Sequence, residues 1–400
     1  MIRRLFCTLS IPFIHLMVPF KTWAWQTRHG WLRGLVLELT SAADFLLTGL
    51  HAQNPALIRT WDAFGRGNFV FGKALMVVDH AKAEREIAQP QMRGSYFMGL
   101  PIVGFSPSTF ASNAGPISVS QPARGVLRAH LDEHLLKPHH REPDLGNMRE
   151  RCAEALGDWV NDSRRDHFLC LRGAVMRVLT LLLADVALEK DEAERITTAY
   201  LRRFAELSAF SYYLPAVLSL LGTHEGVRRE VYVPLKAKGI DPLAIDMIMF
   251  AGMFSVGTIL MKCVDHARDF DLDYGALSPR ERVTFVIESL RLFPTVSTVH
   301  RLLEEPETVK LRGREITMQP GQEIAYPFVC IHRDTTVFAD PEALRLDRPE
   351  HEMAAILSWS KGPHVCPARD LSILVTVMML DALAESAGDL REVHLRNIEV

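Results

Sequence analysis

One cysteine, Cys366, stands before the last long apolar segment of the chain, in the stretch WSKGPHVCPARDLSILVTVMML (359–380). The residues after it have the composition of a helix, so its sulfur is predicted to lie near free N–H groups and the positive end of a helix dipole. Both effects lower the pKa of a thiol and favour the thiolate, which is a nucleophile and a metal ligand. A cysteine at a helix start is more often structural than reactive, so this stretch alone leaves both roles open. Gly362 and Pro363 are predicted to turn the chain tightly, and the glycine would let a flat ligand approach the backbone.

The elements that position this cysteine are predicted to be mostly helices, because apolar residues recur with helical spacing up to about residue 290. In DPLAIDMIMFAGMFSVGTILMKCV (241–264), Asp241 is a candidate N-cap and Pro242 suits the first helical position. No charged residue occurs from Met247 to Met261. A helix that is apolar all round is expected to be buried on all sides, in the middle of the protein.

A second helix is predicted in SPRERVTFVIESLRLFP (278–294). Ser278 and Glu281 have the spacing of a capping box, and Pro294 is expected to end the helix. Glu288 and Arg291 would lie on one face of it.

The pattern changes after this helix. ETVKLRGREITMQPGQEIAYPF (307–328) alternates around Gly313 and the pair Pro320–Gly321, which is typical of short hairpin strands. The predicted fold class is therefore mostly α with small β elements.

The amino-acid composition indicates a globular protein that does not bind nucleic acid. The chain has 400 residues, of which 48% are hydrophobic and 23% charged, as expected for a globular protein with a large core. A net charge of −3 gives no electrostatic footprint for nucleic acid. The cysteines are scattered without a CxxC pair, which favours free thiols in a reducing compartment and a cytoplasmic location. They are Cys7, Cys152, Cys170, Cys263, Cys330 and Cys366.

The N-terminal stretch LFCTLSIPFIHLMVPF (5–20) follows two arginines and partly resembles a signal peptide. It is interrupted by two prolines and a histidine, and it is shorter than the roughly 20 apolar residues of a spanning helix. We expect this segment to pack on the fold, with contact to a membrane surface as the alternative. An irregular stretch at 93–125, rich in Gly, Ser, Pro and Phe, is predicted to be a loop that lines a pocket.

Taken in order, these motifs resemble those of the cytochrome P450 family of haem-thiolate proteins. The family's cysteine signature is F-G-x-G-x-H/R-x-C-x-G, and its places are occupied here by Trp359, Ser360, Gly362, His364, Cys366 and Ala368. Glu288 and Arg291 stand where the family has its E-x-x-R helix. HRDTTVFADPEALRLDR (332–348) resembles N-R-D…F-x-D-P-x-x-F-x-x-x-R, which places Arg348 beside them in a buried structural network.

The resemblance covers about residues 120–400 and implies a single P450 domain over 1–400, although residues 1–110 carry no recognisable motif. It implies a long central helix over a haem b, and a loop before the C-terminal helix that supplies Cys366 as the axial thiolate. LFPTVSTVHR (292–301) and QPARGVLRAHL (121–131) resemble the segments that carry arginines for the haem propionates, with Arg124 in place of a usual histidine. The residues expected to bind the cofactor are Arg124, Arg128, Arg301, Trp359, Gly362 and His364.

The chain departs from the family in the central helix. The family pattern A/G-G-x-D/E-T supplies an acid and an alcohol that help deliver protons during oxygen activation. Ala251, Gly252, Phe254 and Ser255 occupy the corresponding places, so Phe254 replaces the acid and Ser255 the threonine. Ser255 can still hold a water, and Thr258 lies one turn on. We expect Phe254 to form an apolar wall, where a glutamate would have a raised pKa and destabilise the fold.

Several functions follow from the resemblance. The preferred one is a monooxygenase or oxidase of an apolar small molecule in specialised metabolism. Since no fused flavin or ferredoxin motif is present, its electrons would come from a separate ferredoxin or flavodoxin and its reductase. The missing acid favours an alternative, a peroxygenase or a rearrangement or dehydration enzyme that bypasses O2 activation. A non-catalytic haem-binding protein and an unrelated helical interaction protein with a buried Cys366 are further alternatives. The stretches at 93–110 and 207–222 are expected to frame the substrate pocket.

Overall fold

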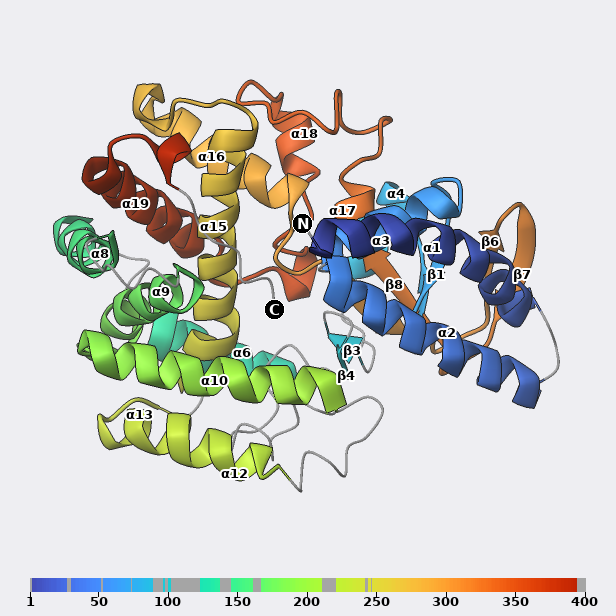
Figure 1. Ribbon diagram of the computed structural model, residues 1–400, viewed down its shortest axis with the longest axis horizontal. Helices are drawn as coiled ribbons and strands as arrows, with labels where there is room; N and C mark the ends of the chain where they lie inside the picture. Colours follow the sequence, from blue (N-terminus) through green and yellow to red (C-terminus); the bar gives the residue numbers. More distant parts are fainter. Residues whose placement is uncertain are drawn as a thin grey trace.

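The computed structural model describes residues 2–26, 30–51, 53–72, 74–88, 96–97, 100–101, 123–136, 145–160, 167–210, 221–241, 244–245 and 247–393. Helices dominate these ranges, as the sequence predicts, and α15 runs through the middle of a group of helices (Figure 1). The strands lie on the other side of the molecule, beside the first three helices (Figure 1). The loop predicted to line the pocket at 93–125 and the pocket-framing stretch at 207–222 fall largely outside the described residues.

The described helices are α1 (Ile2–Gln26), α2 (Gly30–His51), α3 (Gln53–Ala63), α4 (His80–Ile87), α6 (Ala123–Leu131), α8 (Leu145–Val160), α9 (His167–Ala184), α10 (Lys190–Phe210), α12 (Thr223–Val227), α13 (Val233–Ala237), α15 (Phe254–Asp269), α16 (Pro279–Leu292), α17 (Phe328–Ile331), α18 (Glu350–Ala354) and α19 (Arg369–Ala387). Short π-helical or 3-10 segments are η2 (Asp132–Leu136), η3 (Arg228–Tyr232), η4 (Met247–Met253), η5 (Tyr274–Ala276), η6 (Gly362–His364) and η7 (Leu390–Glu392). The larger hydrophobic core cluster takes buried residues from α8, α9, α10, α15, α16 and α19 among others.

The main sheet has the strand order β1-β2-β8-β5. β2 pairs with β8 in parallel, and the other neighbours in this sheet are antiparallel. The strands are β1 (Phe69–Phe71), β2 (Ala74–Met76), β3 (Tyr96–Phe97), β4 (Leu100–Pro101), β5 (Thr298–Leu302), β6 (Glu307–Leu311), β7 (Arg314–Met318) and β8 (Glu323–Pro327). The β6–β7 hairpin turns at Gly313, which has a positive φ of 77°, so the predicted hairpin is confirmed. The short strands β1 and β2, by contrast, were not expected from the sequence.

Asp241 caps the start of the central helix: its Oδ1 accepts a hydrogen bond from the N–H of Ala244 at 3.4 Å, and its carbonyl oxygen accepts one from the N–H of Ile245 at 2.9 Å. This confirms the N-cap, whereas Pro242 lies outside the described residues. The helix is π-helical over η4 and becomes α-helical at Phe254. Among the described helices, only the stretch Met247–Asp269 is long and apolar enough to cross a membrane. Its contacts with α9, α16 and α19 make it a core helix.

The expectation that this helix is buried on all sides is only partly right. Leu260, Cys263 and Val264 are fully buried among the other helices. Residues near the η4–α15 junction, including Ser255, are half-buried because that side of the helix forms a pocket wall. An unbroken apolar run does not distinguish a helix packed all round from one that lines an apolar cavity.

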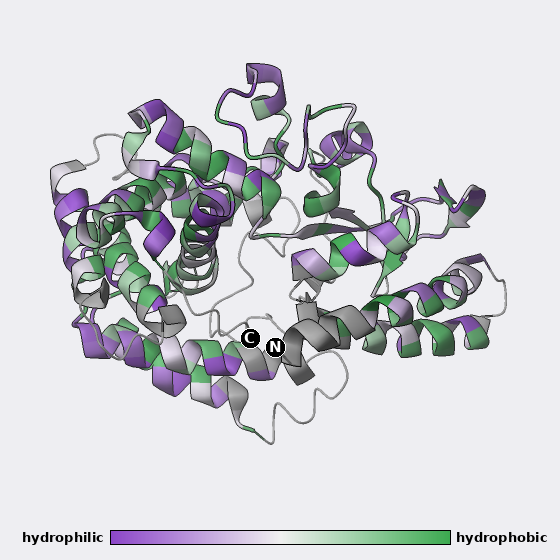
Figure 2. Cartoon of the chain, turned by 45° about the horizontal axis from the view of Figure 1, so that its top comes forward, coloured by the Kyte–Doolittle hydropathy of each residue, from purple (hydrophilic) through white to green (hydrophobic). Residues whose placement is uncertain are grey.

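The N-terminal segment forms α1, which packs against α2 and α3 as expected (Figure 1). Lys21 of α1 pairs with Asp44 of α2, and both side chains are buried. The outer faces of the two helices carry exposed apolar side chains, and hydrophobic positions recur along both helices (Figure 2). They are Ile11, Phe13, Leu16, Phe20, Trp23, Trp31, Leu35 and Leu39. Contact of this segment with a membrane surface stays a prediction.

A buried ion network connects α16 to the segment that follows the sheet. Arg291 donates from Nε to Glu288 Oε1 at 2.7 Å, and Arg348 Nε lies 2.8 Å from the same oxygen. All three side chains are fully buried. Arg291 also donates to the carbonyl oxygens of Pro341 and Ala343, at 2.7 and 2.8 Å. The predicted network of Glu288, Arg291 and Arg348 is confirmed, and the capping box at the start of α16 is formed as well.

Replacing Arg291 by Ala leaves the Glu288 carboxylate short of a partner and removes the donors to two carbonyl groups. We expect the free energy of unfolding to fall by about 3–5 kcal/mol, the cost of breaking a buried ion pair. Chemical denaturation followed by circular dichroism measures this loss. Arg345→Ala is the matched control, because the Arg345 side chain pairs at the surface with Asp347 and only its backbone N–H reaches Glu288. An equal loss in both variants contradicts a special role for the network.

Candidate active site

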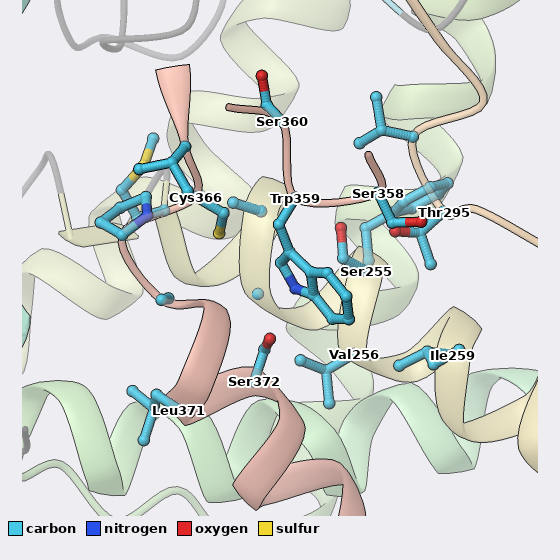
Figure 3. A pocket seen from close by; sticks show the side chains of 18 of the residues that line it. Ser255, Val256, Ile259, Thr295, Ser358, Trp359, Ser360, Cys366, Leu371 and Ser372 are labelled. Atoms are coloured by element: carbon cyan, nitrogen blue, oxygen red, sulfur yellow. The ribbon is translucent and has the colours of Figure 1, made fainter. Parts of the chain in front are cut away.

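A pocket of about 260 Å³ lies between the start of α15 and the loop before α19. Most of its lining is aliphatic, with contributions from α6, α9 and the segment between α16 and β5. Figure 3 shows Cys366, Trp359 and Ser255 among the side chains at its wall. The polar side chains of the described lining are Arg128, Ser255, Thr295, Ser358, Ser360, His364, Cys366 and Ser372.

Successive turns hold the cysteine loop. The N–H of Ser360 donates to Leu357 O at 2.7 Å, and the N–H of Cys366 donates back to Trp359 O at 2.8 Å. The 3-10 turn η6 lies between these two bonds, and α19 begins three residues after the cysteine. The backbone therefore presents Cys366 at the pocket wall, immediately before the helix, as the sequence predicts.

Gly362 is needed for the turn. Its φ is +57°, and a Cβ on it would lie 2.8 Å from Ala88 O and 3.0 Å from Ala88 Cα. The backbone at the end of α4 therefore approaches this glycine closely, a contact that the sequence did not suggest. Gly362 is not part of the described pocket lining, and its contact with a flat ligand stays a prediction.

The thiol of Cys366 does not have the lowered pKa expected for a helix start. Burial raises its pKa, because the apolar pocket disfavours the thiolate more strongly than the backbone N–H of Ala368 and the charge of Arg128 favour it. A bound metal ion reverses this balance, since a coordinating thiol is deprotonated outright. This environment thus favours the thiolate only as a metal ligand.

Three other cysteines have described side chains, Cys152, Cys263 and Cys330; all three are buried, and none of them lines the pocket. Burial raises the pKa of both Cys152 and Cys263 to about 12. Cys366 is therefore the one cysteine of the described pocket lining that can reach a ligand there.

The helical wall brings together the four residues predicted to form it, Ala251, Gly252, Phe254 and Ser255. Phe254 also packs against Phe204 of α10, with ring centroids 5.3 Å apart, which confirms that it forms an apolar wall. Ser255 supplies the one hydroxyl of this wall among the described residues, while the other lining hydroxyls come from different segments.

Thr258 does not line the described pocket. Its Oγ1 donates to Phe254 O at 2.7 Å and accepts a hydrogen bond from Arg172 Nη2 at 2.9 Å. Arg172 belongs to α9, is almost fully buried and stacks over the ring of Phe254, 4.7 Å from its centroid. Sequence reasoning missed Arg172, although an arginine within the apolar stretch HFLCLRGAVMRVLTLLLA was a usable signal.

Comparisons with known proteins point to one family. The family model "Cytochrome P450" matches residues 283–383, which include most of α16, the strands β5–β8 and the cysteine loop. The fold is that of solved P450 structures: cytochrome P450 CREJ in complex with (4-ethylphenyl) dihydrogen phosphate aligns with a TM-score of 0.61 over 83% of this chain and 90% of that chain, at 13% identity. The C-terminal quarter of the chain that carries the cysteine loop is thus similar to the cytochrome P450 family, and the chain has the fold of that family.

Two curated proteins are similar to parts of this chain. It is 26% identical over 221 residues to "Cytochrome P450 monooxygenase sdnT" of Sordaria araneosa, covering 50% of this chain and 36% of that protein. It is 31% identical over 106 residues to "Linoleate 10R-lipoxygenase" of Aspergillus fumigatus, covering 26% of this chain and 9% of that protein. The chain thus spans about a third or less of the length of these relatives.

The donor set at the pocket fits a haem. One thiol, one guanidinium, one imidazole and several hydroxyls lie at a largely aliphatic lining, which suits an iron ligand, anionic propionates and a flat apolar ring. Arg128 donates from Nη1 to Val365 O at 2.7 Å, so it lies beside the cysteine loop, and its predicted contact with a propionate stays a prediction. His364 and Trp359 also line the pocket, whereas the side chain of Arg124 lies outside the described residues.

Arg301, the other arginine predicted to bind a propionate, does not line the described pocket. Its Nη2 lies 2.6 Å from Glu86 Oε2 and 3.1 Å from Glu307 Oε2. Glu86 lies on α4, so a partner from a distant part of the sequence directs this arginine away from the pocket. This placement does not support the propionate-binding role that the resemblance implied for Arg301.

Cys366→Ala should abolish the thiolate signature in the absorption spectrum of the reduced, carbon monoxide-bound haem protein, because no other described cysteine lines the pocket. Cys330→Ala is the matched control and should retain that signature, since Cys330 is buried away from the pocket. Loss of the signature in Cys330→Ala with retention in Cys366→Ala would show that the ligand is misassigned.

The structure also changes the expectation for Phe254→Glu. The guanidinium of Arg172 is within reach of this position, so a carboxylate there has a cationic partner and need not stay protonated. We expect unfolding free energies of Phe254→Glu, Arg172→Met and the double variant to show a favourable coupling of about 0.5–3 kcal/mol between the two residues. A coupling of zero indicates that the glutamate is neutral, as expected from the sequence alone.

Proposed function

We propose that this protein is a cytochrome P450 that carries haem b, a haem-thiolate oxidoreductase that acts as a monooxygenase or related oxidase on an apolar small molecule. The observation that carries the proposal is that Cys366 and Ser255, from different elements, line one largely aliphatic pocket. The relative named a cytochrome P450 monooxygenase, which aligns with half of this chain, supports the reaction type. We extend the proposal to a role in specialised metabolism.

The residues of the chain have separable tasks in this reaction. A bound haem would supply the oxidation chemistry, and Cys366 would hold its iron as a thiolate. Arg128 and His364 are positioned to neutralise propionates at the cysteine side of the pocket. The aliphatic lining excludes water and holds an apolar guest.

Ser255 is the residue that delivers protons in this proposal. Its hydroxyl can hold a water at the helical wall, which the ring of Phe254 cannot do. Thr258 is engaged with Arg172 and with the carbonyl of Phe254, so it is not placed to share this task. Electrons would come from a separate ferredoxin or flavodoxin with its reductase.

A second candidate function is a peroxygenase or a rearrangement enzyme. One observation favours it: the described pocket lining contains no carboxylate, so the side chains there offer no acidic proton donor. A peroxide or a peroxidised substrate brings reduced oxygen with it and needs no electron partner. The similarity to a protein named a linoleate 10R-lipoxygenase agrees with a substrate of fatty-acid type.

Ser255→Ala separates these two functions. With NAD(P)H and surrogate redox proteins, a monooxygenase should form less product per reducing equivalent in the variant and release more peroxide, because one proton-relay position is lost. The effect expected on turnover is about 10²-fold, the lower end of the range for one acid–base position. Ser386→Ala is the matched control, since its hydroxyl bonds to Ala382 O on α19 and does not line the described pocket.

The same variants are then tested with hydrogen peroxide and with a peroxidised fatty acid. Wild-type turnover in this condition alone would replace the monooxygenase proposal with the second candidate. Binding of an apolar guest without turnover in either condition would favour a non-catalytic haem protein. Unchanged coupling in Ser255→Ala would exclude this serine from proton delivery.

A further inference from the structure

Arg172 reaches from α9 to the junction between η4 and α15. Its Nη1 donates to Phe254 O at 3.0 Å and lies 3.4 Å from Met253 O. Its Nη2 donates to Thr258 Oγ1 at 2.9 Å, and that hydroxyl in turn donates to Phe254 O. The guanidinium and the threonine together therefore surround the first carbonyl group of the α-helical part.

Two glycines of the central helix allow α9 to come this close. A Cβ on Gly252 would lie 2.8 Å from Leu179 Cδ1, and a Cβ on Gly257 would lie 3.3 Å from Arg172 Cγ. Both contacts are tighter than ordinary van der Waals packing. The side chain of Arg172 can thus lie along the helix backbone, where it is only 2% exposed.

The junction is where the backbone changes its hydrogen-bond spacing. In a π-helix each N–H bonds to the carbonyl five residues back, and in an α-helix to the carbonyl four back. The two carbonyls that Arg172 contacts, Met253 O and Phe254 O, belong to the last π-helical and the first α-helical residue. The buried guanidinium thus gives the first carbonyls of the α-helical part additional N–H donors, which favour the α-helical winding from this point on.

The opposite side of the same turn is the pocket wall. Gly252, Phe254 and Ser255 line the pocket, while Arg172 and Thr258 do not belong to the described lining. The position of the Ser255 hydroxyl therefore depends on whether the helix changes its winding at Met253 or elsewhere.

We propose that Arg172 is a positioning residue that fixes the change from π- to α-helix at Met253 and thereby places Ser255 at the pocket wall. The role of Ser255 rests on the proposed function, whereas the position of the junction does not. A salt bridge to an acid in the helix is not needed for this task, which agrees with the presence of Phe254 where the family has its acid.

The test uses the full-length protein with Arg172→Met, Arg172→Lys and Thr258→Val. Hydrogen exchange measures the protection of the amides at 253–259, and it needs neither haem nor turnover. Arg172→Met should exchange there roughly tenfold faster, since two carbonyls lose a charged donor. Arg172→Lys, which keeps the charge but only one nitrogen, should restore part of the protection, and Thr258→Val should show a smaller change of the same sign.

A second readout is spectroscopic. The infrared stretching band of carbon monoxide bound to the reduced haem protein reports on the neighbouring helical wall. We expect this band to shift or split in Arg172→Met. Arg177→Met is the matched control, because Arg177 lies on the same helix but bonds to Leu188 O and Glu154. Arg177→Met should loosen α9, but it should neither shift the carbon monoxide band nor speed hydrogen exchange at 253–259.

The proposal would be overturned if folded Arg172→Met exchanged its amides at 253–259 as slowly as the wild type and kept the carbon monoxide band unchanged. If Arg172→Met does not fold, Thr258→Val serves as the test. Unchanged hydrogen exchange at 253–259 and an unchanged carbon monoxide band in that variant would equally overturn the proposal. Wild-type protein that lacks turnover but shows the expected exchange pattern contradicts only the proposed function. The two failures are thus distinguishable.

Discussion

The buried carboxylate of Glu288 is the interaction on which the cysteine side of the molecule depends. Its two arginine partners also donate to carbonyl groups of the irregular segment after the sheet, so three charges organise a stretch that has few backbone hydrogen bonds of its own. The segment then reaches the cysteine loop through His332, which accepts the N–H of Leu357 at 2.9 Å, and through Ser358, which donates to Leu290 O. Desolvation makes each charge costly alone, so the network favours this one arrangement of chain over looser ones.

Two different arrangements of backbone hydrogen bonds form the two sides of the pocket. On the cysteine side, consecutive turns and a glycine with positive φ use short-range backbone bonds, and Cys366 follows them directly. On the helix side, a change of helical winding is held by a side chain from α9. Both arrangements leave the pocket lining largely apolar, because most of the backbone and side-chain groups that form these hydrogen bonds do not face the pocket.

Charge is therefore scarce where the chemistry would occur. Arg128 is the one arginine or lysine of the described lining, and it lies at the cysteine loop. On the central helix an aromatic ring occupies the place of an acid, with a cation stacked on its far side. This distribution suits an apolar guest and leaves proton transfer to a hydroxyl and to water.

The sequence by itself determined the features that depend on neighbours along the chain. The capping box at Ser278, the hairpin at Gly313 and the cysteine before the last helix follow from local spacing, and the ordered motifs were enough to predict the family and the helical wall. The tertiary structure alone decided what depends on distant partners. Arg301 turns to Glu86, Gly362 meets the backbone of Ala88, and β2 joins the sheet beside β8. Burial of Cys366 outweighs the helix start in setting its pKa, and Arg172 finds its acceptors on another helix. Spacing along a chain encodes which face a residue occupies, but burial and partners across space depend on how those faces pack together.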